Sequence, residues 1–325
     1  MGLAKTCQAI VKSQGVFEFE ASTIGNIVCA VLILYFLYMI YFDWISEQHF
    51  GTIRQQIWAF LHFPLHLFLV LGVEGIAQSI KWRAANVVSN SFIAEWTAFT
   101  IPDEPSESYF SDLASQLNGT AYDYLYAALG TATSLDTTLE VFETMEFVDT
   151  AVEHIGEGAT EGTDATYDAV LVVYNALINT IYGIAGFETP KDTSEESDDS
   201  SNLSVEQLYE KLSEQTDKIG GVFGLTFIYF FVSIGLVVIL MTLIAMLSKR
   251  QKTRAHWLRL SVSLFVGVAL CLLALISLAA NTGSNAFVNY ASSPWILPTV
   301  LIALFIIVIL NGIKAPSVLN VRARR

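Results

Sequence analysis

Three ionisable residues within one apolar segment are the strongest candidates for chemistry in this sequence, namely His62, His66 and Glu74. They lie in the run Ile57–Ile80, which is long enough to cross a bilayer as a helix. His62 and His66 are one helical turn apart, and Glu74 is displaced from His66 by about 80°, so the three fall within an arc of about 120°. We expect one wall that faces other helices, because ionisable side chains are costly in contact with lipid.

Three roles are open for this wall. It could pass protons or ions, because imidazole gains and loses a proton near neutral pH and intramembrane ionisable residues often mark such paths. Its side chains are also potential metal ligands, but three on one helix at these spacings make a poor tetrahedral site, so we predict no metal. The third role is hydrogen bonding to neighbouring helices, which would fix their packing. Pro64, between the two histidines, frees the carbonyl of Phe60 within the same helix.

Sequence motifs for other chemistry are missing. The chain has no phosphate-binding loop, dinucleotide fingerprint, serine-hydrolase elbow or HExxH zinc motif, so we expect a non-enzymatic protein without a cofactor. The cysteines are Cys7, Cys29 and Cys271, and they form no CxxC pair. This spacing argues against a disulfide framework and against a cysteine metal site.

Composition indicates a membrane protein. Apolar residues make up 53% of the 325 residues, charged residues make up 15%, and the mean hydropathy is +0.51. A soluble chain of this length normally carries more charge. Aromatic residues at the ends of apolar runs, such as Trp257 and Trp295, are typical of interfacial belts. The pairs Gly220-xxx-Gly224 and Ser263-xxx-Gly267 predict close helix packing. Five runs are long enough to span a bilayer: Ile24–Phe42, Ile57–Ile80, Ile219–Leu247, Trp257–Ala280 and Trp295–Ile313.

Charge is distributed unevenly along the chain. The segment from Trp82 to Lys218 holds 26 of the 31 acidic residues and 4 of the 17 basic ones, so it carries −22 while the remainder carries +8. Lysines and arginines cluster instead in residues 249–254 and at the C-terminus. The positive-inside rule therefore predicts a cytosolic C-terminus and an extracellular or lumenal acidic loop, in the plasma membrane or an endomembrane. This topology accounts for the basic cluster, so we expect no nucleic-acid partner.

Both N-glycosylation sequons of the chain lie in the acidic loop and agree with this orientation. They are Asn118-Gly119-Thr120 and Asn202-Leu203-Ser204, so Asn118 and Asn202 are the candidate glycosylation sites. The charge of the loop has two interpretations. It forms a solvated surface, or it concentrates cations near the mouth of a pore.

The acidic loop is long enough to have structure of its own. Apolar residues at positions 139, 142, 145, 148, 152 and 155 predict an amphipathic helix that ends near Gly156. Ala169–Phe187 is uncharged, and we interpret it as a buried or membrane-apposed helix, with a sixth span as the alternative. Residues 192–202 are typical of a disordered linker. The capping-box pair Ser204 and Gln207 then predicts a helix that continues into the third span.

Part of the chain resembles a known family. The resemblance rests on Tyr35–Asp43, on His49-Phe50-Gly51 and on Arg54–His66, which includes Trp58-Ala59-Phe60-Leu61-His62-Phe63-Pro64-Leu65-His66. These residues look like the low-temperature-requirement A (LtrA) family, especially its fungal members, and His62 matches a histidine that bacterial members also carry. The match covers Gly2 to Trp82 and is only topological from Ile219 onward. The name implies a role in growth in the cold but no particular reaction.

The resemblance also implies what precedes this chain in its relatives. Family members have several earlier spans, with a glycine–glutamate motif just before a segment similar to Gly2-Leu3-Ala4-Lys5-Thr6. This chain is therefore expected to correspond to the C-terminal part of such a protein. A complete ion path then implies either self-association or a missing N-terminal half as partner.

The sequence thus predicts an all-α polytopic membrane protein with about five transmembrane helices. The leading functional hypothesis is a component of an ion- or proton-coupled transporter or channel. The alternative is a structural or interaction protein that acts through its acidic loop. Expected partners are membrane lipid and cations at the loop. The expected parts are an N-terminal segment (1–20), a first transmembrane hairpin (21–81), a helical and disordered acidic extracytosolic loop (82–218), a three-helix transmembrane part (219–313) and a basic cytosolic tail (314–325).

Overall fold

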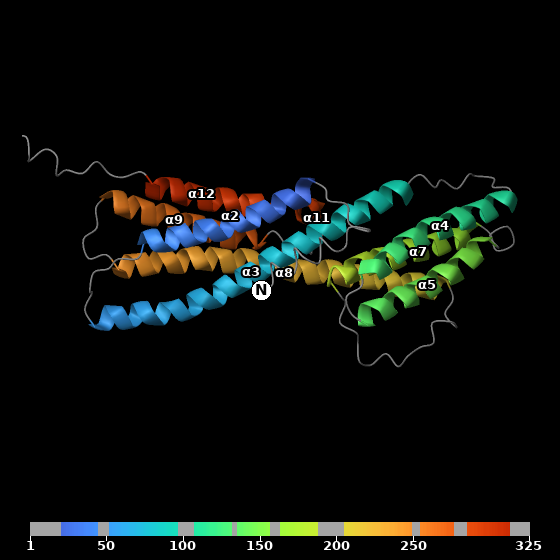
Figure 1. Cartoon of the computed structure of the whole chain (residues 1–325), viewed down its shortest axis with the longest axis horizontal. Helices are drawn as coiled ribbons and strands as arrows, with labels where there is room; N and C mark the ends of the chain where they lie inside the picture. The colour runs from blue at the N-terminus through green and yellow to red at the C-terminus, as the bar shows by residue number, and fades with distance from the viewer. Residues whose placement is uncertain are drawn as a thin grey trace, which may run out of the picture. The chain divides into compact units, whose positions relative to one another are not determined.

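A computed structural model describes residues 21–44, 52–96, 107–131, 135–156, 163–187, 205–248, 254–275 and 285–312. Regular structure within these segments is helical throughout, which confirms the predicted all-helical class for this part of the chain (Figure 1). The helices are α2 (Ala21–Trp44), α3 (Thr52–Trp96), α4 (Glu107–Thr131), α5 (Leu135–Gly156), α7 (Thr163–Ile184), α8 (Val205–Ser248), α9 (Arg254–Leu273), α11 (Asn285–Ser292) and α12 (Ile296–Gly312).

Four of the described helices are long and apolar enough to cross a membrane. They are α2, the stretch Ile53–Asn90 of α3, the stretch Lys218–Ser248 of α8, and α9. The fifth predicted span corresponds to α12, whose 17 residues are at the short limit for crossing the hydrocarbon core. The predicted fourth span extends to Ala280, whereas α9 ends at Leu273, and residues 276–280 lie outside the described part.

The chain forms two compact units. Unit 1 contains Ala21–Ile80 and the residues from Thr226 onward, and unit 2 contains Lys81–Leu225 among the residues that the structure describes. Two long helices, α3 and α8, each contribute residues to both units. The continuous α8 confirms the prediction that one helix begins beside Ser204 and runs on through the third apolar run.

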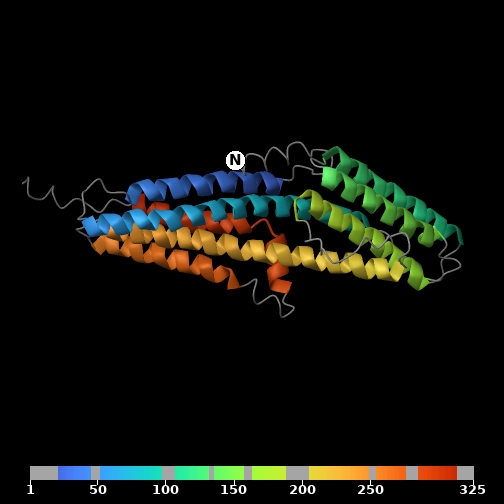
Figure 2. The same cartoon turned by 90° about the horizontal axis from the view of Figure 1, so that it is seen from below.

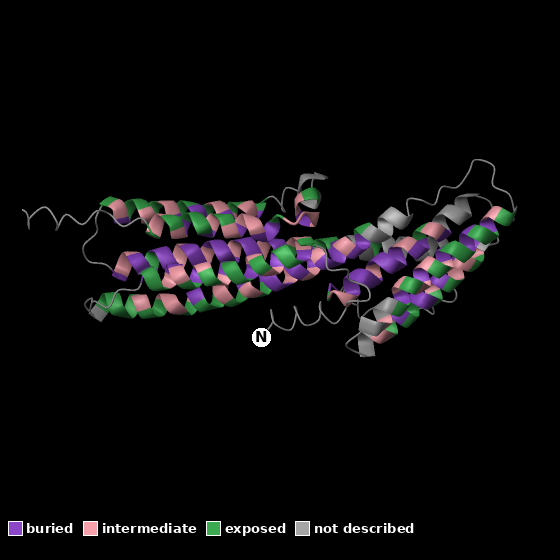
Figure 3. Ribbon diagram, turned by 45° about the horizontal axis from the view of Figure 1, so that its top comes forward, coloured by how far each residue is buried: buried purple, intermediate pink, exposed green. Residues whose placement is uncertain are grey.

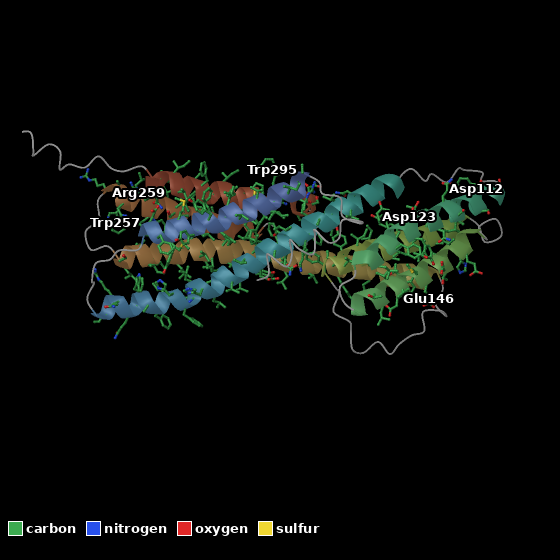
Figure 4. The ribbon with its side chains drawn as sticks, in the orientation of Figure 1. Asp112, Asp123, Glu146, Trp257, Arg259 and Trp295 are labelled. Carbon is green, nitrogen blue, oxygen red and sulfur yellow. The ribbon has the colours of Figure 1, made fainter. Side chains whose placement is uncertain are left out.

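Unit 1 is a bundle of helices that alternate in direction. α2, α8 and α12 run one way, and α3 and α9 run the other (Figures 1 and 2). α12 packs against both α2 and α9. Trp257 and Arg259 lie near the beginning of α9, at one end of the bundle, and Trp295 lies at the beginning of α12, near the other end (Figure 4). Both tryptophans are exposed, which agrees with the expected interfacial positions.

Glycines on α3, α8 and α9 let the helices of unit 1 approach closely. A Cβ placed on Gly75 would stand 2.7 Å from Cβ of Phe230, and one on Gly267 would stand 3.0 Å from the carbonyl oxygen of Gly235. The predicted packing role is therefore confirmed for Gly267, and Ser263, one turn earlier on α9, is buried as well. The same role is wrong for Gly220, because no atom of the described residues lies within 4 Å of where its Cβ would be.

Unit 2 packs α4, α5 and α7 against one another. Its core also takes in the first turns of α3 beyond Ile80, where the Trp82 ring stacks on Phe223 of α8 with centroids 3.9 Å apart. Thr144 of α5 and Thr180 of α7 share a buried hydrogen bond of 2.7 Å. Apolar side chains supply most of the stabilisation here, because each fully buried one contributes roughly 1.5–3 kcal/mol.

The segment Ala169–Phe187 is a buried helix of unit 2, as we expected. Twelve positions from Ala169 to Phe187 are buried, and α7 contacts both α4 and α5. Gly186, with φ of 84°, ends the helix. The amide of Phe187 then donates to the carbonyl of Tyr182 at 3.0 Å, which is the six-to-one bond of a Schellman cap. Phe187 packs its ring on Trp82 beyond this cap.

The apolar face predicted for α5 is wrong at its N-terminal end. Leu139 and Phe142 are exposed, whereas Val141, Met145 and Val148 are buried. Three residues advance only about 300° around a helix, which is about 60° short of a full turn. Residues repeated at every third position therefore rotate away from the core by about 60° at each step. Leu139 therefore lies opposite Val148 on the helix, even though each belongs to the same run of apolar spacings.

Candidate functional site on helix α3

The first half of α3 is the least covered part of unit 1. Between Ile53 and Leu71, only Leu65 is buried, and much of this stretch is exposed (Figure 3). The residues that the sequence singled out, His62, His66 and Glu74, follow one another along this helix. Their positions on its surface decide what they can do.

His62 is half-buried and is held by two hydrogen bonds. Its Nδ1 lies 2.8 Å from the carbonyl oxygen of Trp58, one turn earlier in α3. Its Nε2 lies 3.1 Å from the hydroxyl of Tyr41 on α2. The Trp58 ring packs beside the imidazole with centroids 4.1 Å apart. The α2–α3 contact therefore fixes the orientation of His62.

His66 is exposed and turns outward from α3. Its Nδ1 lies 2.6 Å from the carbonyl oxygen of His62. The hydrogen bond and the ring contact of His66 among the described residues are both with His62, and the two imidazole centroids are 6.2 Å apart. Nε2 of His66 is thus the only polar atom of the ring that remains available.

These contacts set the tautomer of both histidines. A backbone carbonyl can only accept, so each Nδ1 must carry the proton and donate it. In the neutral rings, Nε2 then carries no hydrogen and can only accept. In His62 it accepts a hydrogen bond from the Tyr41 hydroxyl, and in His66 it has no partner among the described residues. An imidazole whose Nδ1–H is fixed on a carbonyl presents Nε2 as a proton acceptor or metal ligand in defined orientation.

Glu74 belongs to a second polar group on the α3–α8 contact. Its Oε1 accepts a hydrogen bond of 2.8 Å from Nε2 of Gln78, one turn later. Tyr229 of α8 lies within electrostatic range of the Glu74 carboxylate and hydrogen-bonds Thr226. The other amide atom, Oε1 of Gln78, is buried without a hydrogen-bond partner among the described residues.

The prediction of a single wall facing other helices is therefore wrong in part. His62 packs against α2, but His66 and Glu74 are exposed. Eight residues separate them, which is about 12 Å along the helix axis. The three side chains do fall within the predicted arc of about 120°, because this follows from their spacing on a helix. Over most of that arc, however, no described helix packs against α3. Within one chain the three residues form two separate groups, not a continuous row.

Sequence reasoning missed the residues that complete these groups. Tyr41 is 21 positions before His62, and Tyr229 is far later in the chain, so no local spacing relates them to the site. Gln78 had a detectable signal, because it follows Glu74 by four residues on a helix. In the part of the chain that the structure describes, no three His, Cys, Asp or Glu side chains lie close enough to hold a metal ion.

Unit 2 carries an acidic outer face. On α5, Glu143, Glu146, Asp149 and Glu153 are exposed at spacings of three and four. Figure 4 shows Glu146 on this helix, with Asp112 and Asp123 on the neighbouring α4. Tyr122 of α4 donates a hydrogen bond of 2.8 Å to Oδ1 of Asp149, and burial together with this carboxylate raises the pKa of Tyr122 to about 12.

The two sequons have different outcomes. Asn118 is half-buried within α4, and its Oδ1 is buried without a hydrogen-bond partner among the described residues. This helical setting differs from the surface loop that a sequon predicts. Asn202 and the predicted linker at 192–202 lie outside the described residues.

Comparison with known proteins gave no relative. The chain matches no protein-family model, no curated protein and no solved structure.

Proposed function

We propose that this protein is a multi-pass membrane protein of the LtrA type in which α3 carries part of an ion or proton path. The observation that supports this best is the run Tyr41–His62–His66, with an open imidazole nitrogen at its outer end. His66 stands about 18 Å along the helix from Arg54 and about 22 Å from Lys81, which is near the middle of the span. An ionisable side chain at that depth is costly to keep unless it has a function.

Flux through reconstituted protein tests this proposal. Proteoliposomes containing the full chain should show pH-dependent ion flux that falls on His66→Ala and on Glu74→Gln. Leu67→Ala is the matched control, because Leu67 is also exposed and lies at nearly the same depth on another side of α3. Unchanged flux in both polar variants, or a wild-type chain without flux, would reject the path.

The proposed orientation places the basic segment 249–254 in the cytosol and unit 2 outside it. It is supported by the charge distribution of the chain. A test uses single cysteines at Asp112 and at Arg254, both exposed, in a chain whose own cysteines are replaced by alanine. In sealed vesicles with the extracellular side outward, an impermeant thiol reagent should label Asp112→Cys at once and Arg254→Cys only after permeabilisation. The reverse order would overturn the orientation.

A second candidate function is binding of a partner through unit 2. The acidic face of α5 favours it, because four exposed carboxylates on one helix face attract a basic partner through charge. Under this function, the triple variant Glu143→Gln, Glu146→Gln and Glu153→Gln should impair the cellular phenotype while Glu74→Gln leaves it intact. If Glu74→Gln impaired the phenotype and the triple variant of α5 did not, the phenotype would depend on α3 instead.

A further inference from the structure

Two neighbouring side chains of α3 present oxygen atoms that the described part of the chain does not complement. Glu74 lies within the membrane-crossing stretch of α3, and none of the described lysine, arginine or histidine side chains forms an ion pair with it. Its described polar contact is the hydrogen bond that Oε1 accepts from Nε2 of Gln78. The amide oxygen of Gln78 is buried and has no donor among the described residues. An uncompensated charge and a buried acceptor without a donor are both costly.

The two side chains lie at the rim of the α3–α8 contact. Gly75 faces α8, because a Cβ there would stand 2.7 Å from Cβ of Phe230. Gln78 is displaced from Glu74 by about 40° and Gly75 by about 100° in the same sense, so Gln78 stands between the open side of α3 and α8. The carboxylate is therefore exposed while the amide oxygen is buried. α8 brings one more oxygen to this level, the hydroxyl of Tyr229, which lies within electrostatic range of the carboxylate.

Neither a proton nor a water molecule complements both groups. A proton on Glu74 removes the charge, but Oε1 of Gln78 still lacks a donor while Nε2 of the same amide stays on Glu74. A water molecule can donate to the amide oxygen, but it does not balance the charge. Lys81 follows two turns later on the same side of α3, but its Nζ lies against Gly186 at the end of α7. A bound cation balances the charge and complements the amide oxygen together.

We propose that Glu74 and Gln78 bind a single alkali-metal cation, Na⁺ or K⁺. Carboxylate and carbonyl oxygens suit hard cations, and in membrane proteins such oxygens replace the hydration shell of the ion. One carboxylate balances one positive charge, whereas divalent ions such as Ca²⁺ are usually held by several. No acidic residue follows Asp217 in the sequence, and Glu95, the other acid of α3, lies about 30 Å further along the helix axis. The inference rests on the proposed path and names its ion.

Thermal unfolding of the full chain in detergent tests this site without any flux. NaCl, KCl and choline chloride are compared at one ionic strength, so that screening of the acidic unit 2 is the same in each. A ligand that binds only the folded chain raises its Tm in proportion to the logarithm of ligand concentration above Kd. We expect Tm to rise with Na⁺ or K⁺ and not with choline, and the ion that acts at lower concentration is the preferred one.

Two variants locate the ion, and a third is the control. Glu74→Gln should abolish the rise of Tm with the alkali cation. Gln78→Leu keeps the size of the side chain but lacks the amide oxygen, so it should raise the concentration for half of the effect by about tenfold or more. Val70→Ala is matched, because Val70 is exposed one turn before Glu74, and it should respond as the wild type does. Cooperative unfolding of each variant in choline chloride shows that it is folded.

Four results would overturn the site. They are a Tm that does not respond to Na⁺ or K⁺, a Tm that responds to pH alone, a rise with Ca²⁺ or Mg²⁺ only, and a rise that Glu74→Gln and Gln78→Leu both retain. The last result would place the ion elsewhere, for example on the acidic face of α5. A rise of Tm that depends on Glu74 in a chain without flux would support the site and reject the path. Flux without any such rise would reject the site and leave the path standing.

Discussion

Gly235 of α8 and Gly267 of α9 bring two helix backbones into direct contact. A Cβ on Gly235 would stand 2.6 Å from the carbonyl oxygen of Gly267, and a Cβ on Gly267 would stand 3.0 Å from the carbonyl oxygen of Gly235. Each glycine faces the backbone of the other helix, so the contact is reciprocal. Such close approach stabilises helix pairs in membranes through dispersion contacts that larger residues prevent.

Gly235→Ala is therefore expected to destabilise unit 1. The new Cβ would overlap the Gly267 carbonyl and the Cys271 sulfur, which forces α9 away. Overpacking of this kind costs about 1–3 kcal/mol. Thermal unfolding in detergent, followed by tryptophan fluorescence, measures the change in Tm. The matched control is Gly25→Ala in α2, where a Cβ meets no atom of the described residues within 4 Å, so its Tm should stay equal or rise. Equal Tm values for both variants would show that the backbone contact is not made.

Tyr182→Phe should destabilise unit 2. The Tyr182 hydroxyl donates a buried hydrogen bond of 3.0 Å to Oδ1 of Asn86, whose amide nitrogen donates to the Trp82 carbonyl at 2.9 Å. Removing the hydroxyl leaves a buried acceptor unsatisfied, which costs about 1–3 kcal/mol. Urea unfolding followed by circular dichroism measures this loss. Tyr126→Phe, at an exposed tyrosine of α4, is the control and should leave the unfolding midpoint unchanged.

Alkaline pH should weaken unit 2 through the same tyrosine. Burial raises the pKa of Tyr182 from about 10 to about 12, although a hydrogen bond with Ser89 acts in the opposite direction. The unfolded chain loses this proton first, so the stabilisation is complete below pH 10 and is lost as the pH rises towards about 12. Unfolding midpoints measured from pH 9 to 12 should fall more steeply for the wild type than for Tyr182→Phe. Parallel curves for the two proteins would contradict this assignment.

Gly186→Ala should strain the end of α7. Its φ of 84° lies in the left-handed region, where an L side chain costs roughly 1–2 kcal/mol. Space is not the limit here, because the nearest atom to an added Cβ is Nζ of Lys81 at 3.5 Å. Gly186→Asn should lose less stability than Gly186→Ala, since asparagine adopts this conformation more readily. Comparison of their Tm values separates backbone strain from crowding, which would affect the larger asparagine more.

Some features of this protein follow from local sequence and were predictable. The helical class and the positions of α2, α3, α8 and α9 follow from apolar runs longer than any soluble helix normally needs. The start of α8 next to Ser204 was also predictable from the capping pattern there. The helical period that follows is uninterrupted, so nothing in the sequence breaks the helix before Ser248. These outcomes depend on residues close in sequence, and the chain satisfies its backbone hydrogen bonds locally wherever it is helical.

Other features depend on which helix faces which, and the sequence leaves that open. The spacing of three along α5 predicts a helix but not its buried side, which the contacts with α4 and α7 decide at Val141 and Val148. The spacing of His62, His66 and Glu74 correctly gives one side of α3. Only the tertiary structure shows that Tyr41 covers His62 while the other two stay exposed.

What the sequence alone determined here is therefore the set of helices, since apolar length, helical period and caps act within a few residues of one another. The tertiary structure alone decided the partners of each helix face: the glycine contact of Gly235 and Gly267, the tautomers of the two histidines, and the uncovered edge of α3. These depend on atoms brought together from distant positions, and packing selects among helix pairings that local energies leave nearly equal.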